Sequence, residues 1–189
     1  RDIDTLSAID GRHENPRYLP GIPLPESLRA TPDLASALAG CDLVLVVVPS
    51  HAFAETLHQL APLRPAHAGV AWATKGFELD SGKLPHQVAN AVLGIAMPKA
   101  VLSGPTFARE VGLGLPTAMT VASRDQDYAL ALARALSGQH FRAYASTDVI
   151  GVEVGGATKN VLAIGAGISD GLGFGANTRV ALITRGLAE

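Results

Sequence analysis

The stretch from residue 42 to residue 48 is the feature that most limits the fold of this chain. Its sequence, DLVLVVV, is apolar at every position after the aspartate, so it has no polar face to turn toward water. A strand of this kind is typical of the interior of a parallel sheet covered on both faces, rather than of a sheet edge. Parallel strands need crossover connections, which are usually helices. We therefore expect an α/β fold.

The rest of the chain alternates short apolar runs with helical patterns, as a helix-covered parallel sheet requires. A short helix is predicted over residues 31–40, with Thr31 as its N-cap, Pro32 at its first position and Gly40 at its end. The proline-rich segment 16–25 is predicted to be a surface loop. Further strands are predicted over residues 69–74, 100–103 and 117–122, and further helices over residues 52–63, 85–93 and 125–136.

The pattern changes after Tyr144. The short strands end with residues 141–144, and continuous helix formers begin near Asp148. The sequence therefore predicts two units, a sheet domain over residues 1–144 and the start of a helical domain over residues 145–189.

Composition excludes several classes of partner. The formal net charge is -2, from 15 basic and 17 acidic residues, and the bases are dispersed, so no basic field for nucleic acid is expected. A single cysteine, Cys41, excludes an internal disulfide and is predicted to be a core thiol in a reducing compartment. No stretch reaches the roughly 18 uninterrupted apolar residues of a membrane span, so we expect a cytoplasmic protein without a span.

One lysine, Lys159, lies in the long apolar and glycine-rich run that fills residues 151–175. Burying an ammonium group without a partner costs several kcal/mol in practice, as a rough figure. Lys159 is therefore expected to face a polar cleft, to pair with an acid, or to titrate near neutrality as a base. The alternative is that it extends its charge to solvent from the side of a helix.

Two predicted strands end in residues that could hold an anion. Lys75 follows one strand and precedes Gly76, so its ammonium could reach across the mouth of the sheet. The tight turn Ser103–Thr106 offers backbone N–H groups and a hydroxyl to an oxygen ligand. Alternatively, Lys75 is a solvated loop lysine, and the turn is an ordinary strand-to-helix connection.

The histidines do not predict a metal site. They show neither a pairing four residues apart nor a spacing to carboxylates that would suit a metal ion. His51, beside a strand end, could act as an acid or base, cap a helix or face solvent. The six positions are 13, 51, 58, 67, 86 and 140.

Several sequence blocks stand out along the chain. They are residues 151–160 (GVEVGGATKN) with residues 165–175, residues 102–111 (LSGPTFAREV), residues 48–51 (VPSH) with residues 72–76 (WATKG), and residues 14–25. Together these blocks resemble those of NAD(P)-dependent glycerol-3-phosphate dehydrogenases, in particular the bacterial members. The resemblance covers essentially the whole chain. Thr158 departs from it mildly, since family members more often have an apolar residue there.

The resemblance implies a Rossmann-like, doubly wound parallel sheet followed by the start of an all-α domain. Residues 1–144 would be a partial dinucleotide-binding domain, because no G-x-G-x-x-G turn and no first βαβ unit are found. Residues 145–189 would begin the substrate and catalytic domain, whose phosphate clamp would lie beyond Glu189. We therefore expect an internal piece of a longer enzyme, inactive by itself.

The activity implied by the resemblance is reversible reduction of dihydroxyacetone phosphate to sn-glycerol 3-phosphate by NADH or NADPH, which supplies glycerophospholipid synthesis. Lys159 would be the catalytic proton acceptor and donor, with its pKa pulled toward neutrality by desolvation or by the second cation, Lys75. The full-length enzyme would be a homodimer acting on a small phosphorylated substrate. The implied substrate-binding residues are Lys75, Gly104, Thr106, Lys159 and Asn160, and the implied cofactor-binding residues are Lys75, Ala108, Pro49 and Phe53.

Two other functions stay open from the sequence. One is another two-domain dehydrogenase, acting on a 3-hydroxy acid or a sugar acid. The other is a non-catalytic nucleotide-sensing module, against which the presence of both Lys75 and Lys159 counts. For Phe53, an aromatic residue one turn into a helix, a place in the core is the alternative to a cofactor contact. The choice between NADH and NADPH is not encoded in these residues.

Overall fold

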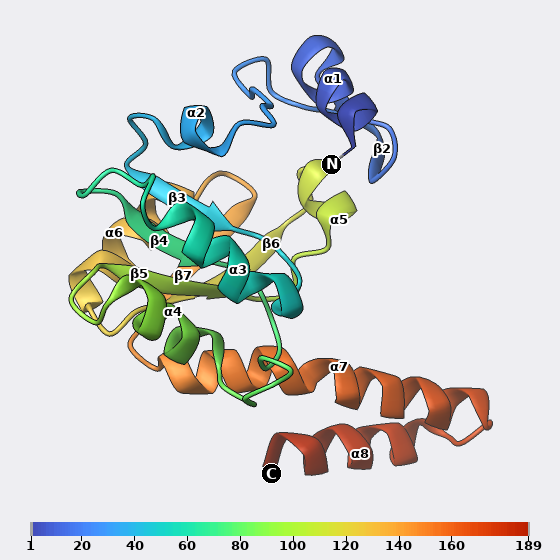
Figure 1. The fold of residues 1–189 in the computed structure, drawn as a ribbon. Coiled ribbons are helices and arrows are strands. Elements are labelled where there is room, and N and C mark those ends of the chain that lie inside the picture. The colour runs from blue at the N-terminus through green and yellow to red at the C-terminus, as the bar shows by residue number, and fades with distance from the viewer. Residues whose placement is uncertain (1, 189) are drawn as a thin grey trace.

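The chain forms an α/β structure in which helices cover a five-stranded sheet (Figure 1). The computed structural model describes residues 2–188. The predicted fold class is confirmed. In chain order, the elements are α1 (Ile3–Arg12), β1 (Glu14–Asn15), β2 (Leu19–Pro23), α2 (Leu34–Leu38), β3 (Leu43–Val46), α3 (Ser50–Leu60), β4 (Gly69–Trp72), α4 (Pro85–Leu93), β5 (Lys99–Ser103), α5 (Ala108–Gly112), β6 (Thr117–Ala122), α6 (Gln126–Leu136), β7 (Phe141–Ser146), α7 (Val149–Gly171) and α8 (Ala176–Ala188).

The sheet is mixed rather than wholly parallel. Its strand order is β3-β4-β5-β6-β7, with β3, β4 and β5 parallel to one another and β7 parallel to β6. Strand β6 runs antiparallel to β5. The connection between these two strands holds only the five-residue helix α5, which does not cross the sheet to restore the parallel direction. The carboxyl ends of β3, β4 and β5 therefore share one edge of the sheet, and this edge carries the candidate site.

Strand β3 is at the end of the described sheet, which corrects the expectation of an interior strand. Val46 is buried, whereas Leu45 is 47% exposed and Val47 is 66% exposed. Within residues 2–188, β4 is the one neighbour of β3 in the sheet, so one face and one edge of this apolar strand are open. Residues 42–48 were correctly predicted to form a strand. Their sequence does not show which strands lie beside it in the sheet.

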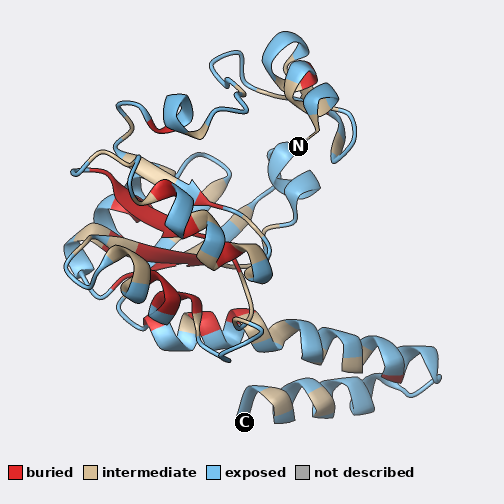
Figure 2. Cartoon of the chain, in the orientation of Figure 1, coloured by how far each residue is buried: buried red, intermediate tan, exposed pale blue. Residues whose placement is uncertain are grey.

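Side chains of the central strand β4 alternate between two hydrophobic clusters. Val70 and Trp72 belong to the first cluster, which lies under α3, α4 and the start of α7. Ala71 belongs to the second cluster, which lies under α6. Because helices cover both faces, all four residues of β4 are buried, and the buried residues gather along the sheet (Figure 2).

The N-terminal part differs from the prediction in two places. Helix α2 begins after Asp33, not after Thr31, because the Asp33 carboxylate accepts hydrogen bonds from the amides of Ala35 and Ser36, both at 3.2 Å. The segment predicted as a loop over residues 16–25 contains β2, which pairs antiparallel with β1. Ile22 on β2 is 4% exposed, so one side of the hairpin is packed against the rest of the protein.

The other predicted elements are confirmed, with shifts at their ends. The helix predicted from residue 52 begins at Ser50, and α6 has Asp125 as its N-cap. Cys41 is half-buried and packs against the first cluster. The sheet ends with β7 at Ser146, two residues after the predicted domain change at residue 144; the division itself stays a prediction.

Helices α7 and α8 form a pair that projects from the sheet (Figure 1). The Asp148 carboxylate caps α7 by accepting from the Gly151 amide at 2.8 Å. Among residues 2–188, α7 alone has the length and mean hydropathy, 1.2, that would let a helix cross a membrane. Core helices of soluble proteins pass the same criteria, so this is weak support for a span. Helix α8 is described as far as Ala188.

The first cluster should dominate the stability of the sheet. Leu57 on α3 is fully buried, at 0% exposure. We expect Leu57→Ala to lower the free energy of unfolding by about 2–5 kcal/mol, because it removes apolar contacts and leaves a cavity. Leu63→Ala is the matched control, since Leu63 lies just after α3 and is 44% exposed. Urea denaturation of the full-length protein checks this, and equal losses in the two variants would contradict the assigned core.

Candidate active site

Two lysines from distant parts of the sequence meet at the carboxyl edge of the sheet. Lys75 follows β4, and Lys159 lies on α7. The Nζ atom of Lys75 donates a hydrogen bond to the carbonyl oxygen of Gly104, just past β5, at 3.2 Å. The Nζ atom of Lys159 lies 5.9 Å from the centre of the Phe107 ring. The fold thus joins three blocks that are far apart in the chain.

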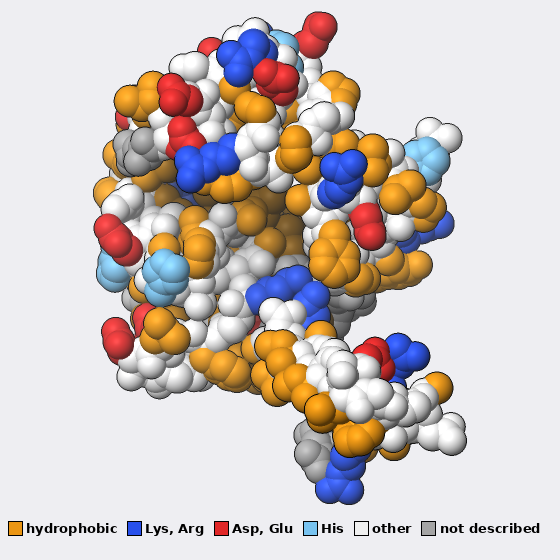
Figure 3. All heavy atoms as spheres, turned by 90° about the vertical axis from the view of Figure 1, so that its right-hand side faces the viewer, with side chains coloured by type: hydrophobic (Ala, Val, Ile, Leu, Met, Phe, Trp, Pro, Cys, Tyr) orange, Lys and Arg blue, Asp and Glu red, His pale blue; other side chains and the backbone are white. Residues whose placement is uncertain are grey.

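The electrostatics of the pair favour an anionic ligand. Burial lowers the pKa of the Lys75 ammonium, and the nearby positive charge of Lys159 lowers it further. Both effects penalise the charged form of a base. A negative group bound between the two lysines would offset the repulsion between them. The face that contains this edge is hollowed, with Lys or Arg side chains at the margin of the hollow (Figure 3).

Gly104 is required by close packing at the end of β5. Its carbonyl accepts from Lys75 and also from the amide of Thr106, at 3.0 Å. A Cβ atom at this position would lie 2.7 Å from the carbonyl oxygen of Ala118 and 2.9 Å from the Cα of Met119. These are backbone atoms of β6, so a larger residue would displace the turn that holds Lys75.

Helix α7 approaches the sheet edge closely through another glycine. A Cβ atom on Gly156 would lie 2.9 Å from Ser103 Oγ and 3.8 Å from Lys75 Cγ. Gly156 is buried, and it is one turn before Lys159 on the same helix. The absence of a side chain there lets the helix that carries Lys159 lie against the strand ends.

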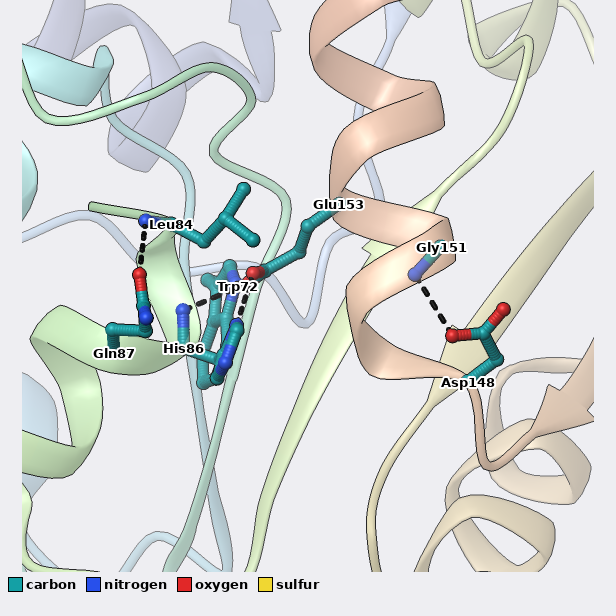
Figure 4. A network of polar contacts seen from close by, with 7 residues as sticks. All are labelled: Trp72, Leu84, His86, Gln87, Asp148, Gly151 and Glu153. Atoms are coloured by element: carbon teal, nitrogen blue, oxygen red, sulfur yellow. Dashed lines mark hydrogen bonds and ion pairs between the residues drawn. The ribbon is translucent and has the colours of Figure 1, made fainter. Parts of the chain in front are cut away.

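A buried carboxylate next to the lysines escaped the sequence analysis. Glu153 on α7 is 4% exposed and accepts from Trp72 Nε1 at 3.1 Å and from the His86 amide at 2.9 Å. Its second oxygen lies 2.5 Å from His86 Nδ1 (Figure 4). Burial raises the pKa of the Glu153 carboxyl, and the bond from His86 opposes that effect. The available signal was an acid in the apolar first half of the helix, six residues before Lys159.

The remaining predicted residues line the same edge at varying exposure. Thr106 is half-buried in the turn after Gly104, and Ala108 is exposed at the first position of α5. Pro49 is exposed at the N-terminal end of α3, and Asn160 is exposed on α7. Their contacts to substrate or cofactor stay predictions.

Phe53 is placed in the core rather than at the open edge. It is 3% exposed, and its ring centre lies 5.7 Å from that of Trp72. This packing favours the structural alternative for Phe53, and its predicted contact with a nicotinamide ring stays a prediction without support from the geometry.

Within residues 2–188, no group of three or more His, Cys, Asp or Glu side chains could hold a metal ion. His51 is exposed on α3. A cavity of about 140 Å³ lies behind the Glu153 network, lined in part by Trp72, His86 and Lys99, and neither Lys75 nor Lys159 lines it.

Comparison with known proteins gives a consistent family. Residues 1–129 match the family described as NAD-dependent glycerol-3-phosphate dehydrogenase N-terminus, and residues 148–189 match its C-terminus. A glycerol-3-phosphate dehydrogenase (NAD(P)+) of Stenotrophomonas maltophilia is 60% identical over 189 residues, which are all of this chain and 55% of the relative. The chain therefore spans about half the length of the curated relatives it matches.

Solved structures give the same result. A crystal structure of glycerol-3-phosphate dehydrogenase from Coxiella burnetii matches 99% of this chain and 57% of its own, with a TM-score of 0.90 and 46% identity. A prephenate dehydrogenase from Aquifex aeolicus matches 76% of this chain and 54% of its own, with a TM-score of 0.55 and 13% identity. The second likeness shows the fold alone, which is Rossmann-like.

Gly104→Ala should disturb the turn that holds Lys75. The new methyl group would meet the backbone of β6, so we expect the free energy of unfolding to fall by about 1–3 kcal/mol. Gly138→Ala is the matched control, because a Cβ atom there meets nothing within 4 Å. Its effect should stay within about 0.5 kcal/mol in the same urea titration. If Gly104→Ala left the free energy of unfolding unchanged, the turn would have room for a methyl group, and the close packing described here would be wrong.

The pKa of Lys75 should depend on Lys159. Lys159→Gln removes the positive charge that helps to lower it, so the pKa of Lys75 should rise while staying below 10.5, because burial remains. A ¹³C NMR titration of the lysine side chains measures this directly. Lys83→Gln, which removes an exposed lysine, should leave the pKa of Lys75 unchanged. If the two variants gave the same pKa, the two lysines would not interact.

Proposed function

The chain belongs to the NAD-dependent glycerol-3-phosphate dehydrogenase family, and from that premise we propose that the full-length protein reversibly reduces dihydroxyacetone phosphate to sn-glycerol 3-phosphate with NADH or NADPH. The observation that carries the proposal is the pairing of Lys75 and Lys159 at the edge where parallel strands end. Open α/β sheets bind ligands at this edge, and the two charges suit a phosphorylated ketone.

Lys159 is the proposed acid and base. During reduction its Nζ donates a proton to the substrate oxygen at C2, and during oxidation the same atom accepts that proton. The Phe107 ring, 5.9 Å away, lies on one side of this ammonium. Helix α7 supplies a fixed backbone for the transfer, because Gly156 holds the helix against β5.

Lys75 is the proposed binding lysine. Its hydrogen bond to the Gly104 carbonyl orients the ammonium across the mouth of the sheet. There its positive charge attracts the anionic substrate. Gly104 and Thr106 are proposed to contact the substrate from the turn after β5, and Asn160 from α7.

The residues at the edge also fit a dinucleotide. No side chain caps the N-terminus of α3, so its first amides remain available to an anionic group, and Pro49 is exposed beside them. Gly76 has a φ of 99°, which lets the backbone after Lys75 turn tightly beside a ligand. Pro49, Lys75 and Ala108 would hold the cofactor. When bound, its nicotinamide ring supplies or accepts the hydride.

The cellular role follows from the reaction. We propose a cytoplasmic homodimer whose product supplies glycerophospholipid synthesis. Residues 1–144 would hold the cofactor and residues 145–189 would begin the substrate domain.

Two alternatives lead to different experimental results. Another two-domain dehydrogenase would share the fold, as the prephenate dehydrogenase does at 13% identity, but would not turn over dihydroxyacetone phosphate. A nucleotide-sensing module would bind the cofactor without turnover. The lysine pair counts against the second alternative, since binding alone needs no base beside a second cation.

The proposed function is tested with the full-length protein by oxidation of NADH and NADPH that depends on dihydroxyacetone phosphate. Lys159→Ala should lower kcat by about 10²- to 10⁴-fold, because it removes the general acid. Lys75→Ala should raise KM for the ketone as well as lower the rate, whereas the exposed Lys83→Ala should change neither. If the wild-type protein bound the cofactor but did not turn over dihydroxyacetone phosphate, the proposed substrate would be wrong. If Lys159→Ala had a near-normal kcat, the assignment of Lys159 as the acid and base would be wrong.

A further inference from the structure

Glu153 is a buried acid whose place on α7 is not explained by packing. It is 4% exposed on a largely apolar helix. Burying a carboxylate costs free energy unless it is hydrogen-bonded, and a well-packed apolar side chain often serves stability as well or better. The carboxylate therefore calls for a role beyond holding the fold together.

Its contacts fix α7 relative to two other elements. One oxygen accepts from Trp72 at the end of β4 and from the His86 amide at the start of α4, and the other lies 2.5 Å from His86 Nδ1. When Glu153 is ionised, its carboxylate only accepts, and Nδ1 then carries the proton of this bond. Three bonds from two directions determine both the rotation of α7 and its position along its axis (Figure 4).

The same contacts form a short route between the two lysines. Trp72 is three residues before Lys75, and Glu153 is six residues before Lys159. Six residues of helix span about 9 Å. Between them, Gly156 lies against Ser103 and near the stem of Lys75. A change at the carboxylate is therefore expected to move Lys159 relative to Lys75, because only a short length of helix separates them and little of the movement can be lost along it.

We propose that Glu153, held by His86, is a positioning residue that sets the separation between the ammonium groups of Lys75 and Lys159. The effect on catalysis rests on the proposed function. The effect on the separation of the two lysines does not depend on it. The carboxylate touches neither lysine in the described structure; it acts through the helix.

The kinetic test uses the full-length protein. Glu153→Ala should lower kcat by about 10- to 100-fold with KM changed by less than about threefold, because a displacement near 1 Å is enough for such a loss. Glu153→Gln should retain kcat within about threefold, since its amide can accept from Trp72 and donate to the other tautomer of His86. Leu136→Ala, a half-buried change in the second cluster on α6, is a destabilised control that should keep kcat. If Glu153→Ala does not fold, His86→Ala is a milder variant that removes only the contact with Nδ1. It should lower kcat in the same direction by a smaller factor, and an unchanged kcat would overturn the part assigned to His86.

A double variant separates positioning from general damage. In the Lys159→Ala background, Glu153→Ala should cause no further loss of residual turnover, because its effect passes through Lys159. Losses that multiply would overturn the proposal.

A second readout does not require the reaction. The pKa of Lys75, followed by ¹³C NMR, should rise in Glu153→Ala as Lys159 moves away, and should not change in Leu136→Ala. An unchanged pKa in Glu153→Ala would overturn the proposal. If wild-type protein lacks turnover, the proposed function fails, and this titration still decides whether Glu153 positions the pair.

Discussion

The close approach of α7 to the carboxyl edge of the sheet is the constraint on which the site depends. Three positions on this helix have different tasks: Glu153 fixes its register, Gly156 permits contact, and Lys159 faces Lys75. None of the three acts without the others. A helix held one turn away would leave Lys75 as an ordinary loop lysine beside a glycine carbonyl. The site is therefore a property of the junction between sheet and helix rather than of either part.

The junction concentrates positive charge without neutralising it. The acid that is buried nearby bonds to Trp72 and His86, and within residues 2–188 it forms no ion pair with either lysine. The Lys75 ammonium is held by a neutral carbonyl instead. Such a cleft is less favourable empty than filled, because like charges repel at low solvent exposure. An acid next to the lysines would have stabilised the fold by pairing with them. Without such a pair, the same attraction can stabilise a bound anion instead.

The sequence allowed the local structure to be predicted, but not the neighbours of each element. The runs at residues 69–74 and 117–122 were correctly predicted as strands because apolar character alone identifies them. The position of β3 at the sheet end and the reversed direction of β6 depend on pairings between distant residues. For the site, Lys159 was singled out as the one lysine of an apolar run, and Lys75 and Gly104 by their places after predicted strands. The family blocks supplied the roles expected of them, and the structure brings the three residues together. Glu153 was missed because its partners, Trp72 and His86, are 81 and 67 residues away in the chain.

The network around Glu153 contains the single tryptophan of the sequence. The indole N–H of Trp72 is bonded to the helix, and its ring packs beside Phe53 in the core. Indole emission is sensitive to the polarity and hydrogen bonding of its surroundings. These 189 residues therefore have a single native fluorophore, which lies at the junction of sheet and helix. Loosening of α7 from the sheet can be followed in unlabelled protein, because it would break the bond from this indole to Glu153.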